Sequence, residues 1–184
     1  VTRGEIVSEV LGAGTLEARF KTVVSAKISG RLEEVLVDQN DRVVRGQLLV
    51  RLDDRSLRTQ VELAQASVEV ARASVDRIRA DEARSQATAK QARQEFERVS
   101  LLVERKAVSQ ADLDKAVESL HVAEAGIRQA TAATVEAELQ VVTAERNLSV
   151  QEEQLDDTRI LSPLDGLVVR RNRDPGDIVV PGAS

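Results

Sequence analysis

Several residue types that commonly build active sites and protein cores are missing from this 184-residue chain. It contains no cysteine, methionine, tryptophan or tyrosine. It has only two phenylalanines and one histidine. The chain therefore cannot form a disulfide or use a cysteine nucleophile, and it offers almost no soft or imidazole ligand to a transition metal. Since aromatic residues make up 1% of the chain, we expect a thin core of small and branched side chains between close-packed elements.

The charge pattern also excludes classes of function. The net charge is −5, so the chain lacks the basic excess that marks a nucleic-acid-binding surface. Charged residues of both signs are intermixed and make up 31% of the chain, which is typical of long solvated helices. No apolar run approaches the ~20 residues that span a bilayer. The chain begins with Val1, and we expect any membrane anchor to lie outside this sequence.

A long central segment carries a strong helical signal. Residues 54–155 contain no proline and a single glycine, Gly126. Small and apolar side chains recur there at alternating steps of three and four residues, a 3.5-residue repeat that indicates a left-handed coiled coil. We call these positions the seam. They are Leu57, Val61, Ala64, Val68, Ala71, Val75, Ile78, Glu82, Ser85, Ala89, Ala92, Phe96, Val99 and Val103, and then Leu113, Ala116, Leu120, Ala123, Ile127, Ala130, Thr134, Ala137, Val141, Ala144, Leu148, Gln151 and Leu155.

The two seam tracts are out of phase, and a turn signal lies between them. Ser109 followed by Asp112 resembles a capping box at a helix start, while the cations Arg105 and Lys106 suit the end of a preceding helix. We therefore predict an antiparallel hairpin, with helices at 54–105 and 109–155 and a turn at 106–108. Each arm would be ~70–75 Å long. The alternative is one continuous rod that dimerises.

The two ends of the chain read as β-structure. Short β-branched runs punctuated by Gly, Asn and Asp occupy residues 23–53 and 158–184. Each segment carries two glycines 16 residues apart, Gly30 and Gly46 in the first and Gly166 and Gly182 in the second. Further matches share the same offset of 136 residues: Asn40, Asp41 and Val43 correspond to Gly176, Asp177 and Val179. We infer two related halves of one small β domain, with the helices inserted between them.

This layout resembles the periplasmic adaptor (membrane fusion) proteins of tripartite efflux pumps and type I secretion systems. Residues 28–35 (ISGRLEEV), 41–48 (DRVVRGQL) and Leu52-Asp53 are similar to the first lipoyl-like half of that family. Residues 158–166 (TRILSPLDG) and 175–179 (PGDIV) are similar to the second half. The resemblance implies an α+β fold, in which a long coiled-coil hairpin (54–157) is inserted between the halves (23–53 and 158–184) of a lipoyl-like, barrel-sandwich hybrid domain.

The resemblance also implies a function and its partners. Such an adaptor is not an enzyme. It links an inner-membrane transporter, either an ABC or a proton-driven one, to an outer-membrane channel, and it assembles in a ring, typically a hexamer. It would sit in the periplasm, anchored to the inner membrane, and it needs no cofactor, metal or nucleic acid. Residues 1–22 look like the strand that begins a mostly absent β-barrel region of the family.

The family carries a channel-contacting motif at the hairpin tip. It consists of an Arg, a Leu four residues later and a Ser seven residues after that, a spacing that Arg98, Leu102 and Ser109 match. Arg98 and Leu102 each fall one residue before a seam position, so they border the hairpin core and could face a partner. Val108, in the turn, is the fourth residue that we assign to partner binding. The structural alternative is that Ser109 only caps a helix and Arg98 is a solvated charge.

Two other functional classes share parts of this pattern. Lipoyl or biotinyl carrier domains use the same two-half sandwich but expose a modifiable Lys in the turn between the halves, where this chain has Asp53, Asp54 and Arg55. A generic coiled-coil spacer would leave the glycine-spaced repeat unexplained. The paired carboxylates Asp53/Asp54 and Asp156/Asp157 are explained better by helix ends than by acid–base catalysis. We expect no catalytic residue.

Overall fold

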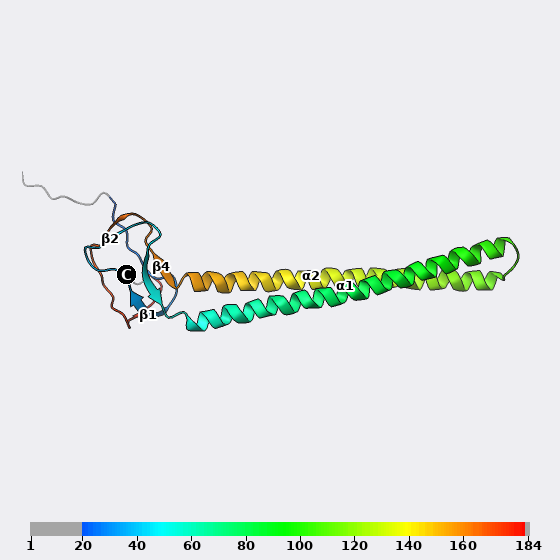
Figure 1. Cartoon of the computed structure of the whole chain (residues 1–184), viewed down its shortest axis with the longest axis horizontal. Coiled ribbons are helices and arrows are strands. Elements are labelled where there is room, and N and C mark those ends of the chain that lie inside the picture. The colour runs from blue at the N-terminus through cyan, green and yellow to red at the C-terminus, as the bar shows by residue number, and fades with distance from the viewer. Residues whose placement is uncertain (1–19, 183–184) are drawn as a thin grey trace, which may run out of the picture.

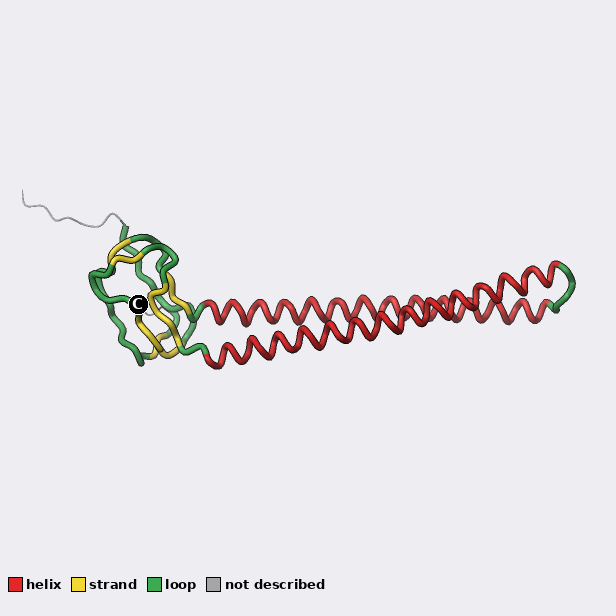
Figure 2. Tube along the Cα trace, in the orientation of Figure 1, coloured by secondary structure: helices red, strands yellow, loops and turns green. Residues whose placement is uncertain are grey.

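A long helical hairpin projects from a small β domain (Figures 1 and 2). The computed structural model describes residues 20–182. The hairpin consists of α1 (Arg55–Glu104) and α2 (Gln110–Asp156), which lie side by side and antiparallel. The predicted fold class is confirmed, and the alternative of one continuous rod is wrong. The proposed boundaries between domains stay a prediction, and residues 1–19 of the expected N-terminal strand region lie outside the described residues.

The seam holds the two helices together. Every seam position predicted from the 3.5-residue repeat is buried or half-buried. Because alanine alternates with larger side chains along much of both helices, the backbones can approach closely, and the core is only one layer thick. The most buried seam residues are Val61, Ala64, Val68, Val75, Ala89 and Ala92 on α1, and Ala116, Thr134 and Ala137 on α2.

Cross-helix ion pairs fix the register along one flank of the hairpin. Arg72 contacts Glu145 at 2.7 Å, and Arg79 contacts Glu138 at 2.7 Å. Arg93 contacts Glu124 at 3.0 Å, nearer the tip. Each step along α1 is matched by an equal step backwards along α2, as an antiparallel coiled coil requires. We call this row the ion-pair ladder, and its flank the ladder flank.

One polar layer interrupts the apolar seam. Glu82 is a seam residue, and its carboxylate accepts hydrogen bonds from the hydroxyls of Thr134 at 2.7 Å and Thr131 at 2.8 Å. These two hydrogen bonds lower the pKa of Glu82 below its ordinary value. A polar seam residue satisfied only by particular partners disfavours shifted registers, because a slip would leave the carboxylate unpaired.

The β domain is built from strands that come from both ends of the chain. β1 (Gly30–Val35), β3 (Leu48–Leu52), β4 (Arg159–Leu161) and β6 (Ile178–Val179) form a sheet in the order β4-β3-β1-β6. β2 (Arg42–Val43) pairs with β5 (Gly166–Leu167). The small core of the β domain contains Ala26, Leu32, Leu52 and Val179, with Ile28, Val50 and Ile160 packed against them.

The internal repeat is a structural repeat in which each half supplies a strand to the other. Gly30 pairs with Val179, and the equivalent pair, formed with the roles exchanged, is Gly166 with Val43. Matching backbone hydrogen bonds flank these pairs. The amide of Leu32 donates to the carbonyl of Asp177 at 2.8 Å, and the amide of Val168 donates to the carbonyl of Asp41 at 2.9 Å. The turn residues Asn40 and Gly176 have φ of 73° and 98°, the left-handed conformation expected from their types.

Ion pairs hold the base of the hairpin against the β domain. Lys27 contacts Asp157 at 2.6 Å, which ties the first half to the end of α2. Asp53 contacts Arg55 at 2.8 Å, and hydrogen bonds from Arg55 lower the pKa of Asp53 to about 2. Asp54 is the N-cap residue of α1, but its buried carboxylate pairs with Arg58 instead of capping a backbone amide. These carboxylates are engaged in structural contacts, as the sequence interpretation favoured over catalysis.

Candidate docking site at the hairpin tip

Two capping structures close the hairpin at its tip. At the end of α1 the amide of Ala107 donates to the carbonyl of Leu102 at 2.9 Å, and the amide of Lys106 donates to the carbonyl of Val103 at 2.8 Å. This is a Schellman motif, which requires a left-handed residue, and Lys106 has φ of 58°. At the start of α2, Ser109 and Asp112 form the capping box predicted from the sequence. The turn between the helices is therefore short and hydrogen-bonded.

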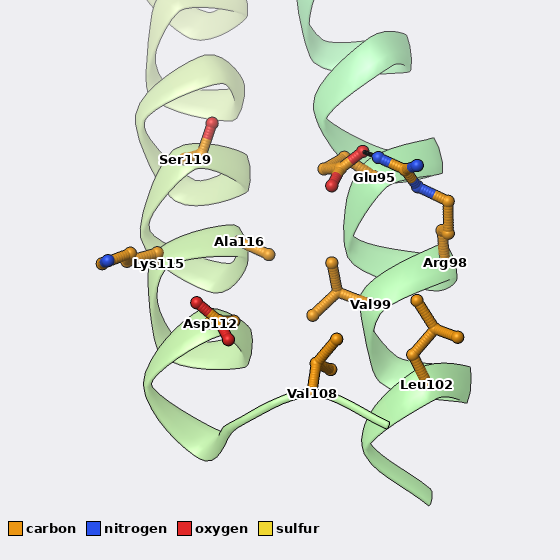
Figure 3. A pocket seen from close by; sticks show the side chains of 9 residues that line it. All are labelled: Glu95, Arg98, Val99, Leu102, Val108, Asp112, Lys115, Ala116 and Ser119. Atoms are coloured by element: carbon orange, nitrogen blue, oxygen red, sulfur yellow. Dashed lines mark hydrogen bonds and ion pairs between the residues drawn. The ribbon is translucent and has the colours of Figure 1, made fainter. Parts of the chain in front are cut away.

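A hollow of about 490 Å³ lies between the two helices next to this turn (Figure 3). Its apolar part comes from both helices and the turn, and Figure 3 shows Val99, Val108 and Ala116 pointing into the space between the helices. The lining residues are Glu95, Arg98, Val99, Leu102, Val108, Asp112, Lys115, Ala116 and Ser119. The hollow therefore combines an apolar floor with charged side chains around it.

Three of the four charged residues around the hollow, Glu95, Arg98 and Asp112, are held by neighbours on their own helix. Arg98 forms an ion pair with Glu95 on α1. Asp112 accepts hydrogen bonds from the hydroxyl of Ser109 at 2.6 Å and from its amide at 3.2 Å, and these bonds lower the pKa of Asp112. Both signs of charge are present, so the rim can receive a partner with mixed charges.

The structure brings three of the four sequence-predicted residues to this hollow. Arg98, Leu102 and Val108 line it, with Leu102 and Val108 half-buried and Arg98 exposed. Ser109 does not line it, because its hydroxyl lies in the capping box. The role of all four in binding a partner stays a prediction.

Sequence reasoning did not assign the residues that α2 contributes to the hollow. The sequence indicates Asp112 only as a cap partner and gives no separate signal for Lys115 or Ser119, which also line the hollow. Their shared signal is helical spacing, since Lys115 follows Asp112 by three residues and Ser119 follows Lys115 by four, which places all three on one face of α2. That spacing becomes informative only when the register of α2 against α1 is known.

A second hollow of about 710 Å³ continues the first one away from the tip. The two share Glu95, Lys115 and Ser119. The second is also lined by Thr88, Gln91, Ala92, Glu118, Val122 and Ala123. The outer third of the hairpin thus has one grooved flank, while the opposite flank carries the ion-pair ladder.

Comparison with known proteins places the hairpin in a family. Residues 76–148 match the family model described as "RND MFP, alpha-helical hairpin domain". Macrolide export protein MacA of Yersinia pestis is 32% identical over 180 residues, which is 98% of this chain and 45% of that protein. Multidrug resistance protein MdtA of Xenorhabdus bovienii (strain SS-2004) is 28% identical over 171 residues, 93% of this chain and 35% of that protein.

A solved structure supports the same assignment at the level of the fold. The crystal structure of MacA from Actinobacillus actinomycetemcomitans superimposes with a TM-score of 0.67 at 23% identity, over 90% of this chain and 47% of that one. The chain therefore spans less than half the length of these relatives. Among residues 20–182, neither helix combines the length and apolar character needed to cross a bilayer. With residues 76–148 matched to its model, the chain carries the alpha-helical hairpin of the RND membrane fusion protein family, and over nearly its whole length it is similar to MacA.

Proposed function

We propose that this chain is the hairpin-bearing part of a periplasmic adaptor that links an inner-membrane transporter to an outer-membrane channel for efflux or secretion. The hairpin tip contacts the channel. The observation that carries the proposal is the tip hollow, where Arg98, Leu102 and Val108 meet beside a capped turn. The names of the related export and multidrug resistance proteins agree with a role in efflux.

The tip can bind a partner by extending its own helix packing. The α1 seam is apolar from Ala89 to Val103, and next to its end Leu102 and Val108 offer half-buried apolar surface at the tip of the hairpin. The end of another helix pair could cover this surface while its polar groups meet Arg98 and Lys115. Apolar anchors and arginines at the centre of a small interface commonly dominate its affinity.

The adaptor would act by geometry and not by chemistry. A 50-residue α1 is ~75 Å long at 1.5 Å per residue, so the tip is held far from the β domain. The ladder and the seam keep this arm straight and in one register. Several copies, typically six in the family, would surround the path of the exported substrate in the periplasm.

A matched pair of neighbouring leucines gives the sharpest test. Leu102 lines the tip hollow, whereas Leu101 is 56% exposed and lies outside it. Leu102→Asp in the full-length protein should abolish export, because a carboxylate would replace the central apolar contact. Leu101→Asp introduces the same charge one residue away and should preserve export. Arg98→Asp should resemble Leu102→Asp.

The measurement is drug susceptibility, including to a macrolide, in cells that carry each variant in place of the native gene. Circular dichroism of each purified variant checks that the hairpin remains helical. Normal export in both Leu102→Asp and Arg98→Asp would refute the tip assignment. Lost export together with lost helicity in Leu102→Asp would show that this leucine is a core residue instead.

A further inference from the structure

Four exposed cations gather at the tip of the hairpin, on its grooved flank and in the turn. Arg98 and Lys115 line the tip hollow, and each directly precedes a seam residue of its helix. Arg105 follows Arg98 by seven residues, so the repeat places it on the same side of α1. Lys106 is the next residue, at the apex of the turn. We call these four residues the tip cations.

Three acids of the tip lie on the ladder flank instead. Glu97, Glu104 and Asp114 are exposed, and each directly follows a seam residue. Glu97 also follows the ladder residue Arg93 by four residues, so this repeat position faces the ladder flank. Within residues 95–120, all of which the structure describes, that flank carries no lysine or arginine. The tip is therefore polarised across its width, with cations beside the hollow and acids away from it.

The two acids in the rim of the hollow do not block the tip cations. Asp112 is held by Ser109 in the capping box. Glu95 forms an ion pair with Arg98, but the two side chains are 46% and 67% exposed. Because an exposed pair of this kind contributes little free energy, a carboxylate of a partner can replace Glu95 beside Arg98.

The other three tip cations are available to a partner. Within the described residues 20–182, the side chains of Arg105, Lys106 and Lys115 form no hydrogen bond and no ion pair. A cation at the end of α1 offsets the helix dipole, and Arg105, the C-cap residue, already supplies one. The dipole therefore gives no separate reason for the charge of Lys106.

The backbone at Lys106 also argues for a use of its side chain outside the fold. Its φ of 58° is the left-handed conformation, in which glycine is the usual residue at this position of a Schellman motif. A lysine here is less favourable to the turn than a glycine would be. Backbone conformations of this kind concentrate at functional sites, where the side chain serves a ligand or a partner.

We propose that the tip cations receive an acidic protein surface, formed by carboxylate side chains at the periplasmic end of the outer-membrane channel. This rests on the proposed function and adds to it the chemistry of the partner and the flank that meets it. Leu102 and Val108 supply the apolar contact. The cations orient the partner so that its carboxylates face the grooved flank and avoid Glu97 and Glu104, since charges around an interface chiefly set its orientation and association rate.

Removing the two charges at the apex without harming the turn tests the proposal. The variant is Arg105→Gln with Lys106→Gly in the full-length protein, assayed by drug susceptibility in cells. Glycine suits the left-handed conformation, so the variant should remain helical by circular dichroism. We expect docking to be about tenfold weaker, because charge complementarity raises association rates by about tenfold or more. The cells should therefore become at least about fourfold more susceptible to an exported drug.

The matched control removes two charges from the ladder flank. Glu97→Gln with Glu104→Gln should not weaken export, because these acids face away from the proposed contact. Single variants at Lys106 separate charge from backbone conformation. Export should be retained in Lys106→Arg, reduced in Lys106→Gly and reduced further in Lys106→Glu, which opposes a carboxylate to the acidic partner. A purely structural role of Lys106 would instead make Lys106→Gly the best of the three.

Photo-cross-linking in cells distinguishes a protein partner from an anionic lipid. A photoreactive amino acid replaces Ala107, which is exposed between Lys106 and Val108. We expect an adduct with an outer-membrane protein, joined within a segment that contains aspartate or glutamate. The yield should fall about tenfold when Lys106→Glu is added. An adduct with lipopolysaccharide or phospholipid alone would overturn the proposal, because the cations would then bind phosphate groups.

The export assay separates this inference from the tip assignment on which it rests. Lost export in Leu102→Asp together with normal export in Arg105→Gln with Lys106→Gly would mean that the tip docks a partner but that its cations do not select it. An equal loss in the control with Glu97→Gln and Glu104→Gln would also overturn the acidic counter-surface. Normal export in Leu102→Asp and in every charge variant would instead overturn the tip assignment itself.

Discussion

Replacing Val68 by aspartate tests whether the seam is the main source of hairpin stability. Val68 is 5% exposed and lies between the two helices. Burying a valine side chain contributes about 1.5–3 kcal/mol, and the aspartate loses most of that. The new carboxylate is also placed in an apolar layer without a partner, which costs several kcal/mol more. We therefore expect Val68→Asp to destabilise the hairpin by roughly 4 kcal/mol or more.

This loss is large enough to measure by urea unfolding followed by circular dichroism. With a urea dependence of about 2 kcal/mol per molar, a 4 kcal/mol loss lowers the midpoint by about 2 M. Leu120→Asp, in the seam of α2, should act in the same direction. Its loss should be smaller, because Leu120 is only half-buried.

The matched controls are the exposed neighbours Glu69 and Glu118. Glu69→Ala and Glu118→Ala remove charged side chains outside the seam and should each cost less than about 0.5 kcal/mol. Equal losses at seam and surface positions would refute the register. So would a Val68→Asp hairpin as stable as the native one.

Three further outcomes follow from the ladder, the β domain and the hairpin base. Arg79→Glu should lower the unfolding midpoint by placing two carboxylates together, and adding Glu138→Arg should restore it, with a coupling of about 0.5–1 kcal/mol in a double-mutant cycle. Arg42→Cys with Leu167→Cys, which face each other across β2 and β5, should form a disulfide within one chain, and its absence on mass spectrometry would contradict the pairing of the halves. The pKa of Asp53 is about 2 in the folded chain and about 3.9 in the unfolded chain. The contribution of this carboxylate to stability is therefore present above pH ~4 and is lost as the pH falls towards 2. Asp53→Asn should remove that part of the pH dependence of the urea midpoint.

The helices and the seam could be predicted because their signals are local. A 3.5-residue repeat identifies the buried face of each helix, and every position that it selected is at least half-buried. Ser109 and Asp112 mark the start of α2 because a capping box is made by residues three apart. The glycine repeat could be detected because the two halves need left-handed residues at equivalent turns, such as Asn40 and Gly176.

The partners across the hairpin could not be predicted, because periodicity identifies a face but not the residue opposite it. Arg79 could have met any glutamate on α2 until the register was known, and the pair with Glu138 is what fixes it. The α2 side of the tip hollow, with Lys115 and Ser119, depends on the same register. Asp54 shows a different limit. Its position before a helix indicated a cap, but its carboxylate forms an ion pair with Arg58, four residues later, instead of capping a backbone amide.

The turn at the tip stores strain at the place where we propose that function resides. Lys106 adopts φ of 58° so that the Schellman hydrogen bonds at the end of α1 can form. A side chain in this conformation costs roughly 1–2 kcal/mol, which glycine avoids. Lys106→Gly should therefore stabilise the hairpin by about 0.5–1 kcal/mol, after allowance for the greater freedom of glycine in the unfolded chain.

Two companion variants separate strain from charge in this turn. Lys106→Ala removes the same charge but keeps the Cβ atom, so it should be less stable than Lys106→Gly, and the difference between them measures the strain. Lys106→Val should be the least stable of the three, because a β-branched side chain tolerates the left-handed region poorly. Thermal unfolding of the variants checks this order. If Lys106→Gly were no more stable than Lys106→Ala, the turn would not be strained at Lys106, and the tip would owe its shape to the capping box at Ser109 instead.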